Sequence, residues 1–147
     1  MHFREKMIRF SIFFLALLIL SCDVSTPEEA GQAALENALD ELELAFNLHH
    51  IDEIMVYYSP DYLHNGDDKD DVQLDWEIRL NDYQEMVLDD IVIELNDDRA
   101  TISFIRRFYD NGQMVKVLVD PDDNGDMSYW KQEFDEWKIV GNRENGW

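Results

Sequence analysis

Apolar positions in the first half of the chain recur every three to four residues, which is the spacing of an α-helix with one buried face. The first such stretch has the clearest start. Thr26 can cap it, a proline suits its first helical position, and Glu29 can close a capping box. Asp70 or Asp71 can cap the third stretch. The predicted helices span about residues 27–48, 51–58 and 71–85.

From about residue 91 the apolar positions alternate with polar ones, which is the spacing of a β-strand with one buried face. Clusters of Asp, Asn and Gly separate these runs and are typical of turns. Three helices followed by an antiparallel meander predict an α+β fold, with the helices on one side of a curved sheet. The predicted strands span about residues 91–95, 101–109, 115–119, 128–134 and 137–140, with the last turn at Asp135-Glu136.

Two stretches of the chain carry a family resemblance. Residues 45–62 have the pattern of a helix, a short loop, a second helix and an extended segment, and residues 134–140 that of a turn, a tryptophan and a final strand. Together they resemble the nuclear transport factor 2-like (NTF2-like) superfamily, over about residues 28–143. The resemblance implies three N-terminal helices packed on a curved antiparallel sheet that forms a cone, often around a pocket. It also implies that the chain can form a homodimer.

The first 22 residues have the features of a secretion signal. Three basic residues precede an apolar run over residues 10–20, which is too short for a membrane span. The run ends in Ile19-Leu20-Ser21-Cys22, which resembles the bacterial lipobox and contains the only Cys of the chain. The resemblance implies that Cys22 is lipidated and anchors the protein to a membrane. The predicted organisation is a lipoprotein signal peptide over 1–21, a lipid-anchored tether over 22–27 and an NTF2-like domain over 28–147.

The chain is strongly acidic, with 12 Lys and Arg against 33 Asp and Glu and a formal net charge of −21. Residues 1–21 hold three basic residues and one acid, so the remainder carries 9 basic and 32 acidic residues, a formal charge of −23. This charge repels phosphates, which excludes nucleic acid as a charge-driven partner. It also repels anionic lipid headgroups, so the lipid on Cys22 must hold the domain at the membrane. We expect a bacterial cell-envelope location, facing the periplasm or the exterior.

The enzymes of the resembled family provide a pattern for catalysis. Ketosteroid isomerase-like members combine a general-base carboxylate with acidic hydrogen-bond donors in a dry cone. The matching positions hold Leu42, Gly66 with Asp67 beside it, and Trp130, so two of the three roles are unfilled. The histidines lack the spacing of a metal site. The sequence therefore predicts no catalytic residue, no metal ligand and no cofactor.

The segment Asp120–Asp126 has two interpretations. It matches the first positions of a calcium-binding loop, but Lys131 occupies the twelfth position, where a bidentate Glu is expected. A hairpin turn explains the same Asp, Asn and Gly residues and is the interpretation we favour.

Aromatic side chains and one arginine are the candidate ligand contacts inside the predicted cone. Buried Tyr and Trp need partners for their polar groups and often line wet pockets, although they also build cores. Arg106 lies between Phe104 and Phe108 on an inward face, where an apolar residue is expected. It can pair with an internal carboxylate, bind an anionic ligand or lie under a dimer partner. The predicted ligand-binding residues are Tyr58, Tyr62, Trp76, Tyr83, Arg106 and Trp130.

These observations predict a membrane-anchored envelope lipoprotein whose cone-shaped domain binds a small ligand or a protein partner without catalysis. An isomerase- or hydratase-type enzyme that uses the cone pocket is the first alternative. A structural or immunity-type interaction protein with a filled cone is the second.

Overall fold

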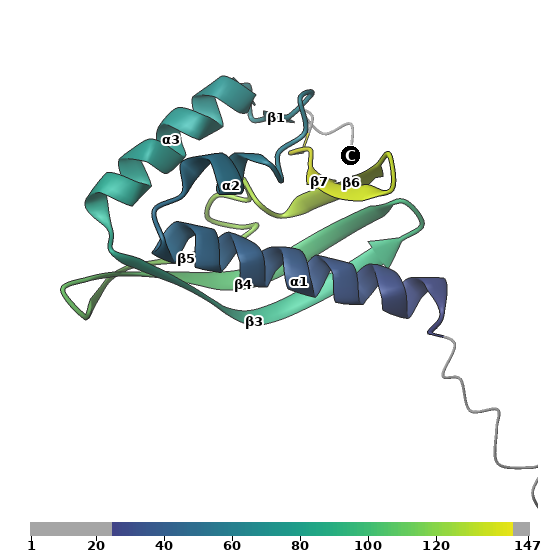
Figure 1. Cartoon of the computed structure of the whole chain (residues 1–147), viewed down its shortest axis with the longest axis horizontal. Helices are drawn as coiled ribbons and strands as arrows, with labels where there is room; N and C mark the ends of the chain where they lie inside the picture. Colours follow the sequence, from purple (N-terminus) through teal and green to yellow (C-terminus); the bar gives the residue numbers. More distant parts are fainter. Residues whose placement is uncertain (1–24, 143–147) are drawn as a thin grey trace, which may run out of the picture.

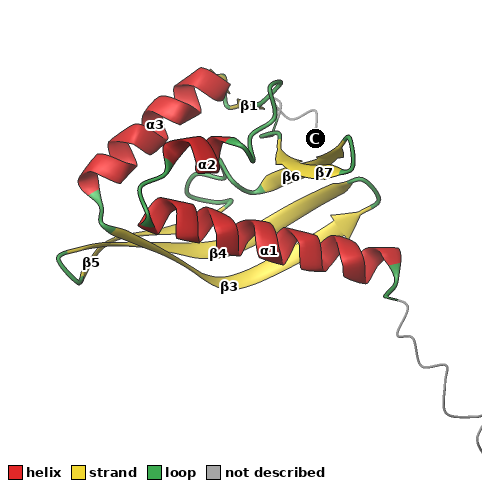
Figure 2. Cartoon of the chain, viewed as in Figure 1, coloured by secondary structure: helices red, strands yellow, loops and turns green. Residues whose placement is uncertain are grey.

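The structure is a computed structural model that describes residues 25–142. Three helices, α1 (Pro27–Asn47), α2 (Ile51–Met55) and α3 (Lys69–Asp82), lie on one side of a strongly curved antiparallel sheet (Figures 1 and 2). The predicted α+β fold is therefore confirmed. The strands are β1 (Leu63–His64), β2 (Asp67–Asp68), β3 (Glu85–Asn96), β4 (Arg99–Asp110), β5 (Gln113–Asp120), β6 (Tyr129–Glu133) and β7 (Glu136–Ile139).

Reciprocal hydrogen bonds fix the start of the two longer helices. At α1, the Glu29 backbone N–H donates to the Thr26 hydroxyl and the Glu29 carboxylate accepts from the Thr26 N–H, as predicted. At α3 the cap is Asp68 rather than Asp70 or Asp71. The predicted cap was wrong because Asp71 is needed three residues into the helix, where its carboxylate accepts from the Asp68 N–H.

Strand β4 is the centre of the large sheet. It pairs with β3 along its length, with β5 along its C-terminal half and with β6 at its N-terminal end. The strand order is β3-β4-β6-β7. Strand β5 also pairs with β4, along the part of β4 that β6 does not reach. Strands β5 and β6 share β4 as their partner and do not pair with each other, so residues 120–126 are not the hairpin turn that we predicted.

The hairpin between β6 and β7 also differs from the prediction. Its turn lies at Phe134 and Asp135, one residue earlier than expected, and both residues have positive φ angles, 51° and 66°. A two-residue turn with this geometry matches the right-handed twist of the flanking strands. Phe134, which alternation places on the same face as Trp130, is instead fully exposed at the tip.

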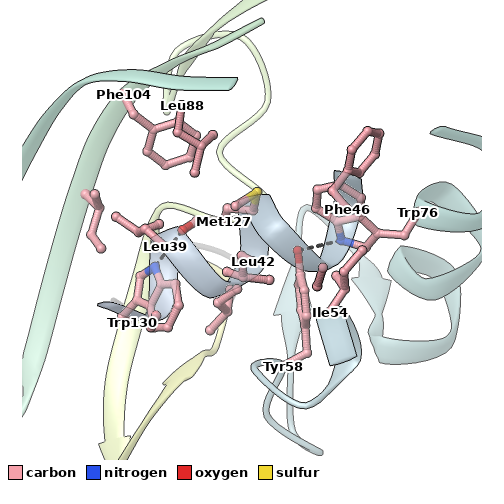
Figure 3. Packing of buried hydrophobic residues seen from close by; sticks show 14 of the residues in the cluster. Leu39, Leu42, Phe46, Ile54, Tyr58, Trp76, Leu88, Phe104, Met127 and Trp130 are labelled. Carbon is pink, nitrogen blue, oxygen red and sulfur yellow. Dashed lines mark hydrogen bonds between the residues drawn. The ribbon is translucent and has the colours of Figure 1, made fainter. Parts of the chain in front are cut away.

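The core lies between α1 and the concave side of the sheet. Alternate residues of β4 face inward, and the apolar face of α1 packs over them. The ring of Phe46 contacts the rings of Trp76 and Phe108 edge to face, at centroid distances of 5.9 and 5.6 Å. Burial of each such side chain contributes about 1.5–3 kcal/mol to the free energy of unfolding. Figure 3 shows this packing.

The predicted signal peptide and Cys22 lie outside the described residues. Within residues 25–142, no helix combines the length and the apolar composition needed to cross a membrane.

Candidate functional site

The six predicted ligand contacts all belong to the interior of the domain or its margin. Tyr58, Tyr62 and Trp76 lie close together, with a Trp76 Nε1–H to Tyr58 hydroxyl hydrogen bond of 2.8 Å (Figure 3) and the two tyrosine rings 5.1 Å apart. Trp130 lies apart from them and donates its indole N–H to the Met127 carbonyl oxygen at 2.6 Å. Ligand contact at these positions remains a prediction.

Arg106 is the central polar residue of this interior. Its side chain is completely buried, and its Cζ lies 5.7 Å from the centre of the Trp76 ring. Its Nη2 atom lies 2.7 Å from Asp126 Oδ1 and 2.9 Å from Asp120 Oδ2. Arg79 completes the group, with its Nη1 atom 2.6 Å from Asp126 Oδ2. We call these four side chains the buried charge network.

The buried charge network is formally neutral, because two guanidinium groups face two carboxylates. Burial alone would raise the pKa of Asp126, but Arg106 and Arg79 hold that pKa well below its usual value. Burial would likewise lower the pKa of Arg106, and the charges of Asp126 and Asp120 raise it instead. Asp126 is therefore an ionised partner of two arginines.

Sequence reasoning considered an internal partner for Arg106 but did not identify Asp126, Asp120 or Arg79. The sequence does indicate that Asp120 points inward, because alternation along β5 puts it on the same face as the partly buried Leu118. Arg79 and Asp126 carry no comparable signal, because α3 and the loop after β5 meet only in the folded molecule.

Two carboxylates at the ends of the segment 120–126 point into the interior, whereas Asp122 and Asp123 between them are exposed. Besides facing Arg106, Asp120 accepts a 2.7 Å hydrogen bond from the Gly125 N–H through Oδ1. Among the described residues, no group of three or more His, Cys, Asp or Glu side chains is arranged to hold a metal ion. At the positions matched to isomerase catalysis, Leu42 and Trp130 are core residues and Asp67 is exposed.

Two features of the outer surface are further candidates for binding. The first is the β5 face, which we define as the exposed apolar side chains Met114, Val115, Val117 and Val119. Residues 114–119 include no acid, although the chain holds 33.

The second feature is a groove of about 650 Å³ beside the first turns of α1, which we call the α1 groove. Its walls come from α1, from the β3–β4 turn and from the β6–β7 hairpin, which meet at the right of Figure 1. None of the six predicted ligand contacts lines it.

Comparison with known proteins gives matches at the level of structure. No protein-family model and no curated protein matches the sequence. An NTF2-like protein of unknown function from Shewanella oneidensis superposes with a TM-score of 0.58 at 15% identity, over 76% of this chain and 95% of that one. A candidate scytalone dehydratase from Novosphingobium aromaticivorans superposes with a TM-score of 0.55 at 11% identity, over 78% and 82%.

Bd1075 from Bdellovibrio bacteriovorus is a longer protein with a similar part. It superposes with a TM-score of 0.58 at 15% identity over 80% of this chain, which spans only 42% of Bd1075. At these identities the likeness concerns the fold and not the activity. The chain thus has an NTF2-like fold, a cone of three helices and a curved antiparallel sheet.

Proposed function

We propose that this protein is a lipid-anchored envelope protein whose NTF2-like domain is a non-catalytic interaction module with a filled cone. The observation that carries the proposal is the buried charge network. Arg106, the best candidate for an anionic ligand, already has two internal carboxylates. The side chains of Arg106, Trp76 and Trp130 have no exposed surface, so a ligand would have to displace them.

An isomerase or hydratase active site receives less support from the same residues. A general base works best when its pKa lies near the operating pH. Asp126 is the buried acid nearest the tyrosines, and its lowered pKa makes it a poor proton acceptor. The Tyr62 hydroxyl is 3.4 Å from the backbone oxygen of Asp126 rather than from its carboxylate.

The β5 face is the surface that we assign to the partner protein. Exposed apolar side chains cluster there, and apolar clusters on a protein surface commonly mark interaction sites. The formal charge of −23 after removal of the leader favours a partner with a basic rim around an apolar centre. A second copy of this chain is the competing occupant, and the like charge of the two copies opposes it.

The lipid on Cys22 would hold this module close to a membrane. Residues 22–26 precede α1, and five residues span at most about 17–18 Å when fully extended. The N-terminal end of α1 would therefore lie near the bilayer surface.

The filled cone is tested by Arg106→Leu, measured as the free energy of unfolding without added ligand. This variant leaves Asp120 without its arginine and Asp126 with only one, so we expect a loss of about 3–5 kcal/mol. Arg107→Leu is the matched control. It removes the neighbouring arginine, which pairs with Asp89 on the partly exposed outer face, and should cost about 1 kcal/mol or less.

A cone that binds an anionic ligand through Arg106 predicts the opposite result. The apo Arg106→Leu protein would then be at least as stable as the wild type. Equal stability of the two proteins would reject the filled cone.

A further inference from the structure

The α1 groove exists because the first turns of α1 carry small residues. Ala30, Gly31 and Ala34 line its floor, whereas the following turns bury leucines and Phe46 against the sheet. A Cβ atom at Gly31 would lie 3.7 Å from both Leu95 and Trp137, so these side chains pack against the helix backbone. The groove therefore has an apolar floor and an apolar wall that includes an aromatic ring.

The charged side chains in the lining are all acidic. Glu28, Asp97 and Asp135 contribute carboxylates from three separate segments, and no Lys, Arg or His lines the groove. Within residues 25–142, none of the three carboxylates forms an ion pair. The N-terminal N–H groups of α1 would favour an anion, but Thr26 already accepts the Glu29 N–H, and Glu28 and Glu29 offset the helix dipole.

An aliphatic amine with two or more ammonium groups matches this lining. Its ammonium groups can pair with the carboxylates, and the aromatic ring of Trp137 is part of the lining, where a cation–π contact would add to binding. Its methylene segments can lie along Ala30, Ala34 and Leu95, where a hydrated metal ion would gain nothing. The groove volume of about 650 Å³ lies within the range of small-molecule sites, about 300–1,000 Å³.

We propose that the α1 groove binds linear aliphatic polyamines. This site is separate from the β5 face and does not depend on the proposed partner protein. The negative field of the domain would concentrate such cations near the groove, while the shape and apolar floor of the groove would distinguish them from simple cations.

The steric test uses two alanines on the same helix turn. Both alanines are exposed, but Ala34 lines the groove and its neighbour Ala33 does not. Spermidine binding to the full-length protein in nonionic detergent would be measured by titration calorimetry at about 150 mM salt. Ala34→Phe should fill the groove and weaken binding at least about tenfold. Ala33→Phe should change the dissociation constant for spermidine by no more than about twofold.

The charge test distinguishes spermidine binding in the groove from diffuse attraction to the negative field of the domain. The groove variant combines Glu28→Gln, Asp97→Asn and Asp135→Asn, and should weaken spermidine binding at least about tenfold. The matched control removes three exposed carboxylates elsewhere, with Asp61→Asn, Asp82→Asn and Asp122→Asn. It should weaken binding less than about threefold.

Three outcomes would overturn the proposal. The first is an equal effect of the two triple variants, because binding would then be diffuse. The second is full binding to Ala34→Phe. The third is binding of a lysine-rich peptide without binding of spermidine, which would make the groove a peptide site.

Discussion

Asp126 is the residue on which the buried charge network depends. It accepts from Arg106 and Arg79 at once, through different oxygens, and so joins the sheet to α3. Removal of either arginine leaves it one charge-assisted hydrogen bond, and such bonds are worth more than neutral ones. The interior therefore requires side chains of the right charge at these positions, as well as side chains of the right volume.

The lowered pKa of Asp126 predicts how its contribution depends on pH. A carboxyl with a lower pKa in the folded state than in the unfolded state stabilises the protein fully above its unfolded pKa, which is about 3.9. That contribution is lost as the pH falls toward the folded pKa. Asp126→Asn should therefore be less stable than wild type by about 3–5 kcal/mol at pH 7. The difference should narrow steadily below about pH 4.

Chemical unfolding of both proteins from pH 7 to pH 3 measures this difference and cancels the shared effect of the surface acids. A difference that stays constant over this range would contradict an ionised Asp126 in the folded protein.

At the level of elements, the sequence predicts best what local residues determine. The start of α1 follows from Thr26 and Glu29, which are three residues apart. The strand containing Arg106 follows from alternation alone, and so does the inward direction of that residue. The pairing of both β5 and β6 with β4 depends on contacts between distant segments, and so does the contact of Asp126 with Arg79 of α3. No local pattern specifies those contacts.

Strand β5 provides the element-level test of partner binding. Val117→Glu places a charge in the middle of the β5 face, next to exposed apolar neighbours, and should abolish docking of a partner with an apolar centre. The measurement is the size of the detergent-solubilised native complex on a native gel. Leu74→Glu is the matched control, because Leu74 is also apolar and exposed but lies on α3.

Light scattering of the purified protein alone shows whether a second copy of this chain occupies the β5 face. We expect the mass of one chain. A mass of two chains that Val117→Glu reduces to one would show that a second copy, and not another protein, covers the β5 face.

At the scale of the whole molecule, the charge and the predicted anchor act in opposite directions. The acidic domain is repelled by anionic headgroups, and lipid on Cys22 would hold it at the membrane nevertheless. The cone, the β5 face and the α1 groove would all be displayed from that single attachment point.

Replacement of Cys22 should therefore release the protein. Cys22→Ala is expected to appear in the soluble or precursor fraction and to incorporate no palmitate analogue on metabolic labelling. Arg9→Ala is a useful control, because it changes the leader but keeps two basic residues and the cysteine. Equal labelling of wild type and Cys22→Ala would contradict lipidation at this position.

The buried charge network also restricts how this sequence can evolve. Any single replacement of one of its charged side chains by a neutral one leaves the network with an unbalanced charge, at a cost that can reach a large share of the stability of a small domain. Replacement of all four side chains by apolar ones of similar volume can be nearly neutral. Descendants of this chain should therefore keep Arg79, Arg106, Asp120 and Asp126 together or lose them together, because the intermediate sequences form a fitness valley.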